Sequence, residues 1–284
     1  MSGCGLESET SMSAEAFHLF NEVLEQRFGL TFPENRRMIL EARLRPRIRE
    51  LHLSSFLEYY YVLQSDGEEE LLRLATLATN NETFFFRERY QFDAFFREGV
   101  AALAPGLAVP GRLRILCAGC SSGEEPFTMS FYAADKRWMP AALEPRIDAF
   151  DVDRTRIESA QRGVYRPRSL REMTDEQVDR YLVREGDGNT RVKPRYQGTV
   201  RFRHANIVEL RSFRDALPYD VVFCRNVLIY FSEAALRLAI DNFATVLRPG
   251  GLLFLGPSES IIGMSPHFET VRLGDCIAYR RVDK

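Results

Sequence analysis

The chain has 284 residues, 45% of them hydrophobic and 27% charged, and a formal net charge of −2. This composition is typical of a globular protein with one large domain or two, and the net charge favours no particular class of partner. No apolar run approaches the roughly 18 residues of a membrane-spanning helix, and the polar start lacks the apolar core of a signal peptide. Because five cysteines are an odd number and suit a reducing compartment, we expect a cytoplasmic protein.

The first 80 residues are predicted to form a small helical domain behind a short tail. Residues 1–13 are rich in Ser, Gly and Glu, and we expect them to be disordered. From Ala14 to Phe28 apolar residues recur at helical spacing, and Gly29 is well placed to end that helix. Helical periodicity returns further along the segment, so we assign residues 14–80 to one all-helical domain.

A row of arginines lies in the second predicted helix of this domain. Pro33 is well placed to start the helix, and Pro46 should kink or break it, because proline lacks the amide donor and crowds the preceding turn. The row could be a solvated helix face, or it could bind an acidic protein or a nucleic acid. No aromatic residues are interleaved for stacking on bases, so we favour an acidic protein. The row consists of Arg36, Arg37, Arg43, Arg45, Arg47 and Arg49.

Three successive phenylalanines interrupt the helical pattern at residues 84–86, flanked by Asn81, Thr83 and Arg87. This stretch could be a linker held in place by its aromatic rings. Polar groups beside so much apolar surface could also form one wall of a ligand pocket. We therefore predict that residues 81–110 link the helical domain to the next one and contribute to its ligand site.

A loop of small residues lies between a predicted buried strand, Leu113–Cys117, and a predicted helix that follows Glu124. The loop could be an ordinary packing turn, or it could hold a nucleotide-like ligand beside the positive end of the helix. Glu124 and Glu125 would repel a pyrophosphate but attract an amino group and a sulfonium, which favours S-adenosylmethionine over NAD. The small loop residues are Gly119, Ser121 and Gly123, and the expected buried helix residues are Phe127, Phe131 and Ala134.

No metal site is predicted. Cys117 and Cys120 form a C-x-x-C pair, but no second pair accompanies them, and the four histidines show no metal-ligand spacing. We expect these cysteines to belong to the strand and the loop.

The second predicted strand, Arg146–Asp153, ends in carboxylates. In doubly wound folds an acid at the end of this strand accepts hydrogen bonds from ribose hydroxyls, and Asp151 is the candidate. Asp153 could instead cap the following helix, Arg154–Arg162.

Between about residues 164 and 204 the pattern is typical of a small antiparallel β insertion. Thr174–Gln177 has the form of a capping box, Glu185–Asn189 is a strong turn, and Thr199–Arg203 alternates as a strand does. Because such an excursion interrupts a nucleotide-binding fold, we expect it to serve in recognition.

A buried central strand is predicted at Val221–Phe223. Cys224, Arg225 and Asn226 follow at its carboxyl end, where open α/β sheets bind ligands. The remaining expected elements are a helix capped by Ser232 that runs through Leu247 and strands at Leu252–Leu255 and Asp275–Arg280.

Four stretches of the chain together resemble one family. The order and spacing of these stretches are similar to those of the chemotaxis receptor protein-glutamate O-methyltransferases, the CheR family. The resemblance, which runs from about Phe17 to Arg280, implies an α/β fold. A class I S-adenosylmethionine methyltransferase domain with a Rossmann-like doubly wound sheet would occupy residues 111–284, with a small antiparallel β-subdomain inserted in it and the all-helical domain before it. The four stretches are Asn81–Glu88, Ala118–Pro126, Phe223–Phe231 and Leu247–Phe254.

The resemblance also implies roles for the matching residues. Arg87 would orient the incoming carboxylate and Tyr230 would lie near the transferring methyl group, so these two are the catalytic candidates. The residues that would hold the cofactor are Asn81, Thr83 and Arg87 at its methionine end, Glu124 and the Gly119 loop near its amino group, Asp151 at the ribose, Asn206 and Ile207 at the adenine, and Cys224, Arg225 and Asn226 around the pocket.

The family's activity is methyl transfer from S-adenosylmethionine to glutamate side chains of chemoreceptors, which leaves S-adenosyl-L-homocysteine. The arginine row would dock the receptor's acidic methylation helices, with no nucleic acid and no membrane insertion, and we expect a monomer. The hairpin at Glu185–Asn189 is short compared with family members that grip a receptor's C-terminal tail, so we do not expect that tethering here. The alternatives are a methyltransferase of RNA or a small molecule and a non-catalytic cofactor-sensing scaffold.

Overall fold

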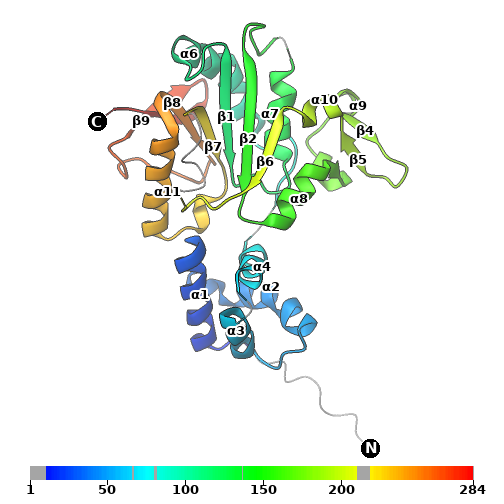
Figure 1. Cartoon of the computed structure of the whole chain (residues 1–284), viewed down its shortest axis with the longest axis vertical. Coiled ribbons are helices and arrows are strands. Elements are labelled where there is room, and N and C mark those ends of the chain that lie inside the picture. The colour runs from blue at the N-terminus through cyan, green and yellow to red at the C-terminus, as the bar shows by residue number, and fades with distance from the viewer. Residues whose placement is uncertain (1–10, 66, 80–81, 136, 210–217, 284) are drawn as a thin grey trace, which may run out of the picture. The chain divides into compact units, whose positions relative to one another are not determined.

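A computed structural model describes residues 11–65, 67–79, 82–135, 137–209 and 218–283. The chain divides into two compact units. The first contains the N-terminal helices together with Tyr230–Ala235, and the second contains the rest of the chain from residue 82 onward (Figure 1). None of the helices in these ranges is both long and apolar enough to span a membrane.

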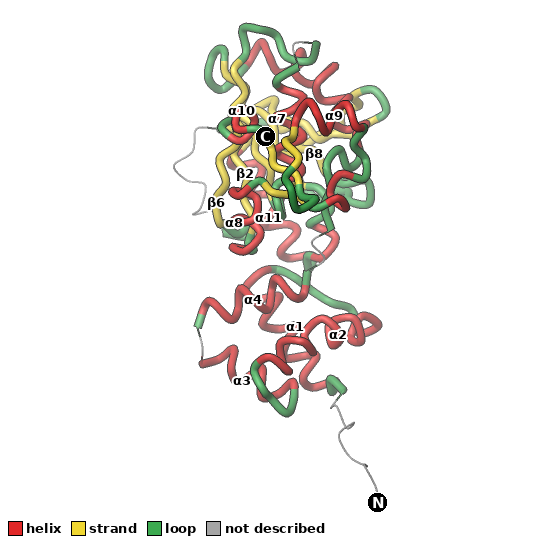
Figure 2. The backbone as a smooth tube through the Cα atoms, turned by 90° about the vertical axis from the view of Figure 1, so that its right-hand side faces the viewer, coloured by secondary structure: helices red, strands yellow, loops and turns green. Residues whose placement is uncertain are grey.

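The N-terminal unit is helical, as predicted (Figure 2). The first helix begins where the Ser13 hydroxyl accepts the Ala16 N–H, and it ends at Gly29, which adopts a left-handed φ of 73°. Its apolar stripe is buried, with Phe20 and Leu24 both 0% exposed. The helices of this unit are α1 (Ala14–Phe28), α2 (Arg37–Glu50), α3 (Phe56–Ser65) and α4 (Glu68–Ala78).

Helix α2 continues through Pro46, so the predicted break at this residue is wrong. Leu44 and Ile48 are buried on either side of the proline, and this packing holds both halves of the helix. Pro46 itself is exposed. Water can therefore satisfy the backbone carbonyl that its missing N–H leaves without a partner.

The second unit is built on a seven-stranded sheet with the order β6-β2-β1-β7-β8-β10-β9 (Figure 1). Five neighbouring strands are parallel, and β10 and β9 close one edge in antiparallel fashion. This is the predicted doubly wound type of sheet, with one strand, β9, that the sequence pattern did not reveal. In chain order the strands are β1 (Arg112–Ala118), β2 (Glu144–Asp151), β6 (Val200–His204), β7 (Tyr219–Cys224), β8 (Leu247–Leu255), β9 (Phe268–Leu273) and β10 (Cys276–Arg281).

Residues 89–106 are helical, and the whole of residues 82–110 belongs to the second unit, so the predicted linker is part of that unit. Phe92 stacks on Phe223 of β7 with ring centroids 6.0 Å apart, and Phe223 stacks on Phe254 of β8 at 4.5 Å. The aromatic residues after the phenylalanine triplet thus pack on the sheet. The helices here are α5 (Arg89–Ala94) and α6 (Val100–Leu103), joined by a π-helical turn, Phe95–Gly99.

Helix α7 (Glu124–Ala133) follows β1 and lies almost wholly in the core. Phe127 and Phe131 are buried as predicted, whereas Ala134 is exposed because the helix ends one residue before it. Asp153 caps α8 (Arg154–Arg162) by accepting the N–H groups of Thr155 and Arg156. The last long helix is α11 (Glu233–Val246), and the hydroxyl of Ser232 accepts the Ala235 N–H at its start.

The insertion contains a three-stranded antiparallel sheet with the order β3-β5-β4. Thr174 and Gln177 form the predicted capping box, and the β4–β5 hairpin turns at Glu185–Asn189. The strand predicted at Thr199–Arg203 is β6, which pairs in parallel with β2 in the main sheet. The insertion therefore ends before residue 200. The prediction placed this strand in the insertion because alternation alone does not tell which sheet a strand joins. Its elements are β3 (Val164–Tyr165), α9 (Asp175–Tyr181), β4 (Leu182–Arg184), β5 (Thr190–Val192) and α10 (Pro194–Gln197).

Candidate functional site

The loop after β1 is shaped by Gly119. This residue has a left-handed φ of 76°, and a Cβ placed on it would lie 2.5 Å from the Cγ2 of Val227. Any larger residue would push the loop away from the segment that follows β7. The Gly119 and Cys120 amides both donate to the Phe150 carbonyl at 2.9 Å, which fastens the loop to the end of β2.

Asp151 holds the same loop from the carboxyl end of β2. One of its carboxylate oxygens accepts the Ser121 N–H at 2.7 Å, and the other accepts the Asp153 N–H at 2.9 Å. Burial raises the pKa of Asp151 to about 6, although these two amide bonds favour the charged form. The side chain is 7% exposed, and each oxygen keeps a second lone pair for a ligand hydroxyl.

The two glutamates at the start of α7 have different surroundings. Glu124 is 2% exposed, and its two carboxylate oxygens accept the hydroxyls of Ser122 at 2.8 Å and Ser169 at 2.9 Å. Glu125 faces the guanidinium of Arg225 at 3.1 Å, and its side chain is 15% exposed. Burial raises the pKa of both carboxyls, and for Glu125 the positive charge of Arg225 opposes that rise.

The loop after β6 lies beside Asp151. His204 pairs with Asp151 in the β2–β6 ladder, and the Ala205 N–H donates to the Asp151 carbonyl at 3.1 Å. Ile207 is 6% exposed, and its carbonyl accepts the Asn242 side-chain amide at 2.8 Å. The structure thus brings Asn206 and Ile207 to the strand end that carries Asp151.

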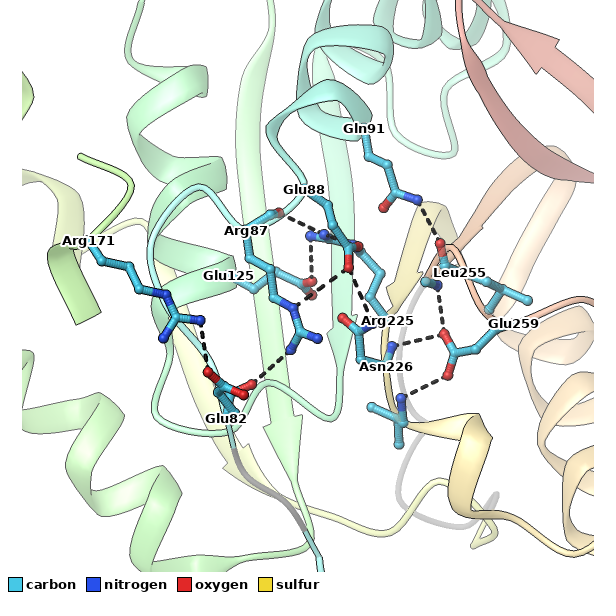
Figure 3. Close-up of polar contacts among 12 residues, drawn as sticks. Glu82, Arg87, Glu88, Gln91, Glu125, Arg171, Arg225, Asn226, Leu255 and Glu259 are labelled. Atoms are coloured by element: carbon cyan, nitrogen blue, oxygen red, sulfur yellow. Dashed lines mark hydrogen bonds and ion pairs between the residues drawn. The ribbon is translucent and has the colours of Figure 1, made fainter. Parts of the chain in front are cut away.

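Arg225 is the centre of a buried polar cluster at the carboxyl end of β7 (Figure 3). Its side chain is 2% exposed and donates to Glu88 at 2.6 Å, to Glu125 at 3.1 Å and to the Arg87 carbonyl at 2.7 Å. The side-chain amide of Asn226 also donates to Glu88, at 3.3 Å. This cluster joins the segment after the phenylalanine triplet to the start of α7 and to the end of β7. Sequence reasoning missed Glu88, and it expected the charge of Glu125 to face the ligand without foreseeing its pairing with Arg225.

Glu259 fixes the segment that follows Arg225. Its carboxylate accepts the backbone N–H groups of four consecutive residues, Asn226 to Ile229, at 2.7–3.3 Å and that of Gly256 at 2.6 Å. Asn226 takes a left-handed φ of 59° at this point. Glu259 therefore locks the loops after β7 and β8 together (Figure 3), and no local motif in the sequence indicated this role.

Arg87 lies at the partly exposed edge of the cluster. Its side chain is 30% exposed, and its guanidinium donates to the Glu82 carbonyl at 2.8 Å and lies 3.7 Å from a Glu88 carboxylate oxygen. Thr83 and Phe84 in the same turn are half-buried, whereas Phe85 and Phe86 are core residues. The two expectations for the triplet thus apply to different residues: Phe85 and Phe86 anchor the segment, and Phe84 remains at the surface. Asn81 lies outside the described residues.

Sequence comparison places this chain in a known family. Residues 81–276 match the CheR methyltransferase SAM binding domain, and residues 15–78 match the CheR methyltransferase all-alpha domain. The chain belongs to the CheR methyltransferase family. The resemblance expected from the four sequence motifs is confirmed, as is the division into a helical and an S-adenosylmethionine-binding domain.

Similar CheR proteins extend over nearly the whole chain. Chemotaxis protein methyltransferase 2 of Vibrio cholerae is 31% identical over 271 residues, which cover 94% of this chain and 93% of that protein. Chemotaxis protein methyltransferase 1 of Pseudomonas aeruginosa is 31% identical over 270 residues, with coverage of 93% and 97%. The chemotaxis protein methyltransferase of Escherichia coli is 29% identical over 268 residues, with coverage of 91% and 88%.

The polar groups around the loop after β1 of the CheR domain are chemically suited to S-adenosylmethionine. The Ser121 hydroxyl is buried and has no hydrogen-bond partner within the described ranges, so it is available to a ligand. Gly119 leaves space that a side chain would fill, and the acids at the start of α7 suit a cationic ligand better than a phosphate. The Asp151 carboxylate offers further acceptor positions, and its role at the ribose remains a prediction.

Two of the residues expected in the CheR pocket have side chains with other roles. Cys224 is 0% exposed in the strand end, and burial raises the pKa of its thiol well above the ordinary value. The guanidinium of Arg225 is occupied by Glu88, Glu125 and a carbonyl. Both side chains lie inside the protein, and their contribution to the cofactor pocket remains a prediction. Tyr230 clusters with the N-terminal unit, where its carbonyl accepts the Thr31 N–H at 2.8 Å, and its catalytic role remains a prediction.

The arginine row on α2 is not uniformly exposed, which corrects the expectation for two of its members. Arg47 donates to both oxygens of Glu70, at 2.9 Å and 2.6 Å, and Glu70 is 7% exposed. Arg43 donates to the Ala78 carbonyl at the end of α4. These two side chains hold the CheR helical domain together, because the same helix face that carries them also packs against α4.

Proposed function

We propose that this protein is an S-adenosylmethionine-dependent methyltransferase that forms methyl esters on glutamate side chains of chemoreceptors. The observation that carries the proposal is the paired match to both CheR domains in their order, residues 15–78 and 81–276. The names of the curated relatives, chemotaxis protein methyltransferases aligned over more than nine tenths of this chain, support the same activity.

The residues that hold the cofactor surround the carboxyl ends of β1, β2 and β6. Asp151 receives the ribose hydroxyls, and Asn206 and Ile207 flank the adenine. For the cofactor's amino group we propose Glu125 in place of Glu124, because both oxygens of Glu124 already accept serine hydroxyls and its side chain is buried. Asn81, Thr83 and Arg87 contribute from the turn before α5.

The chemistry requires positioning more than acid or base catalysis. When bound, S-adenosylmethionine supplies an electrophilic methyl group: a carboxylate oxygen forms the new O–C bond, and the S–C bond breaks with its electron pair going to sulfur, leaving S-adenosylhomocysteine. A glutamate with a pKa of about 4.3 is already ionised at neutral pH, so no general base is needed. Arg87, partly exposed beside the cluster, orients the incoming carboxylate through charge-assisted hydrogen bonds. Tyr230 assists in aligning the reactants.

The receptor is recognised in part by the helical domain. Arg43 and Arg47 link α2 to α4, so docking is assigned to the other members of the row: Arg36 at the N-cap of α2, and Arg37, Arg45 and Arg49 on the helix, where Arg45 also pairs with Glu41. Such a basic helix face suits the acidic methylation helices of a chemoreceptor and speeds their association. The protein acts as a cytoplasmic monomer without nucleic acid and without inserting into the membrane.

The test is transfer of radiolabelled methyl from S-adenosylmethionine to chemoreceptor-containing membranes, followed by treatment with alkali. Label released as methanol identifies a carboxyl methyl ester and supports the proposal. Alkali-stable label would show a different acceptor atom and overturn the glutamate assignment. Cofactor binding without any transfer to receptors would favour the sensing scaffold.

A further inference from the structure

A short 3₁₀ helix of the insertion, Pro167–Leu170, is fastened directly to the cofactor site. Its Ser169 carbonyl accepts the Phe85 N–H at 2.9 Å, and its Ser169 hydroxyl donates to Glu124 at 2.9 Å. One residue thus links the insertion to the phenylalanine triplet and to the start of α7. Side chains next to Ser169 are therefore placed at the edge of the site and not on a remote excursion.

Arg171 ties the next part of the insertion to the same turn (Figure 3). Its guanidinium carbon lies 3.6 Å from the centre of the Phe84 ring, and its Nη2 lies 2.8 Å from a Glu82 carboxylate oxygen. Glu82 and Phe84 flank Thr83, and the Glu82 carbonyl also accepts the Arg87 guanidinium. Arg171 is therefore one contact away from the residues that we assign to the methionine end of the cofactor.

Two further arginines at this edge are not used inside the fold. Arg166 and Arg168 are exposed, and neither side chain has a hydrogen-bond or ion-pair partner among the residues that the structure describes. They belong to a strongly basic stretch: from Arg154 to Arg171 the sequence has six arginines and one acid, Glu158, in a chain whose net charge is −2. The positive charges of Arg166 and Arg168 thus lie beside the site and are available to a partner.

We propose that these residues, Arg166, Arg168 and Arg171, form an insertion rim that docks an acidic segment of the protein substrate next to the methyl-transfer site. This inference rests on the proposed function and adds a second docking surface, on the catalytic domain itself. Guanidinium groups pair with carboxylates in a bidentate fork, so an arginine rim suits a Glu- or Asp-rich helix. The face of the Phe84 ring is covered by Arg171, so the rim offers charge and no ring face for stacking on bases, which favours a peptide over RNA.

The experiment compares the full-length protein with the double variant Arg166→Glu, Arg168→Glu. Methyl transfer to a purified cytoplasmic chemoreceptor fragment is measured over a range of fragment and salt concentrations, and S-adenosylmethionine affinity is measured by calorimetry. We expect the KM for the fragment to rise by about tenfold or more at low salt, because rim charges act mainly on association. The difference should shrink at high salt, where such charges are screened. The turnover number at saturating fragment and the cofactor Kd should stay within about twofold.

The matched control is the double variant Arg272→Glu, Arg280→Glu, which makes the same charge change on β9 and β10 at the opposite edge of the sheet. The control should leave the KM unchanged. Three outcomes would overturn the rim assignment alone. The KM could rise equally in the control, or it could stay unchanged in the rim variant. The third outcome is a rim that binds RNA but has no effect on the KM for the receptor fragment. If the unaltered protein transfers no alkali-labile methyl group to the fragment, the proposed function fails instead.

Discussion

The side chains of Arg225 and Glu88 meet at 2.6 Å, although 137 positions separate the two residues in the sequence. Glu125 reaches the same guanidinium from the start of α7, so one buried cation serves two carboxylates from different segments. The ion pairs therefore connect three segments, namely the turn before α5, the start of α7 and the end of β7. Their value lies in this connection, since a buried pair in itself adds little net stability.

Arg225→Ala should lower the free energy of unfolding by about 3–5 kcal/mol, because Glu88 and Glu125 would stay buried without a cation. Chemical denaturation of the catalytic domain within the full chain measures the loss. Arg225→Lys keeps the charge but loses the fork geometry, so we expect a smaller loss of stability than for Ala. A variant as stable as the parent would show that the carboxylates find water or another cation, and the cluster would not be a structural connector.

Glu125→Gln and Glu124→Gln should have different effects on cofactor binding. Glu125→Gln removes the charge that we assign to the cofactor's amino group, and we expect S-adenosylmethionine affinity to fall by about tenfold or more. Glu124→Gln keeps an acceptor for the hydroxyls of Ser122 and Ser169, so we expect a change of less than about threefold. Isothermal calorimetry on both variants decides between the two acids. A larger loss in the Glu124 variant would return the amino-group role to that residue.

Asp151 should make cofactor binding depend on pH. Burial raises its pKa to about 6 from an ordinary value of 3.8, and only the ionised form accepts hydroxyl hydrogens on both oxygens while keeping its two amide bonds. S-Adenosylmethionine affinity should therefore weaken as the pH falls through about 6. Asp151→Asn should bind the cofactor about tenfold or more weakly at pH 8 and lose this pH dependence. Equal pH profiles in both proteins would remove Asp151 from the ribose site.

The stability of the cofactor-free protein should respond to Asp151 in the opposite direction. A carboxyl whose folded pKa is raised binds its proton more tightly in the folded state than in the unfolded state. The contribution of Asp151 to the free energy of unfolding therefore falls as the pH rises from about 3.8 to about 6. Above that range the full loss of unfolding free energy remains. Urea denaturation at several pH values, with Asp151→Asn as the reference, isolates the contribution.

Arg87→Ala should slow methyl transfer far more than it weakens cofactor binding. Its side chain is partly exposed, donates to the Glu82 carbonyl and lies 3.7 Å from Glu88, but Glu88 keeps its shorter contact with Arg225 when Arg87 is removed. We expect kcat to fall by about 100-fold, since aligning the reacting groups contributes on this scale. Steady-state kinetics with a receptor fragment and calorimetry with the cofactor measure the two effects. A Kd that rises as much as kcat falls would make Arg87 a cofactor ligand only.

The sequence predicts those parts of this fold that depend on local patterns. Strands β1, β2 and β7 follow from short apolar runs, the Gly119 loop from its small residues, and the capping box from Thr174 and Gln177. The class of cofactor followed from acids at the start of a helix, where a phosphate would be repelled. Each of these features is decided within about ten residues of the chain.

The sequence does not predict features that depend on which distant groups meet. Nothing in the local sequence marks three polar residues whose partners are distant. Folding brings Glu88 to Arg225, Glu259 to the backbone amides after β7, and Ser169 to Glu124. The same limit explains the error at β6, whose alternation fits an insertion strand as well as an edge strand of the main sheet. Pro46 was misjudged because packing on both sides outweighs the local cost of proline in a helix.

Arg47 should be a stability residue of the helical domain and not a docking residue. Glu70 is buried; burial alone would raise its pKa, but hydrogen bonds from Arg47 and Tyr59 outweigh that effect and lower the pKa below the ordinary 4.5. Arg47→Ala leaves this carboxylate without its cation, and we expect a loss of about 3 kcal/mol at neutral pH. Hydrogen exchange of the α2–α4 amides in the full chain reports the loss.

The stability lost in Arg47→Ala should depend on pH. A carboxyl with a lowered folded pKa stabilises the fold above its unfolded pKa, and the contribution disappears as the pH falls through the folded value. The difference in the free energy of unfolding between the parent protein and Arg47→Ala should therefore be largest at neutral pH and become smaller below pH 4.5. Arg36→Ala, a change at an exposed member of the same row, should leave exchange rates unchanged and reduce receptor methylation. If Arg47→Ala instead reduced methylation with unchanged exchange rates, Arg47 would belong to the docking face after all.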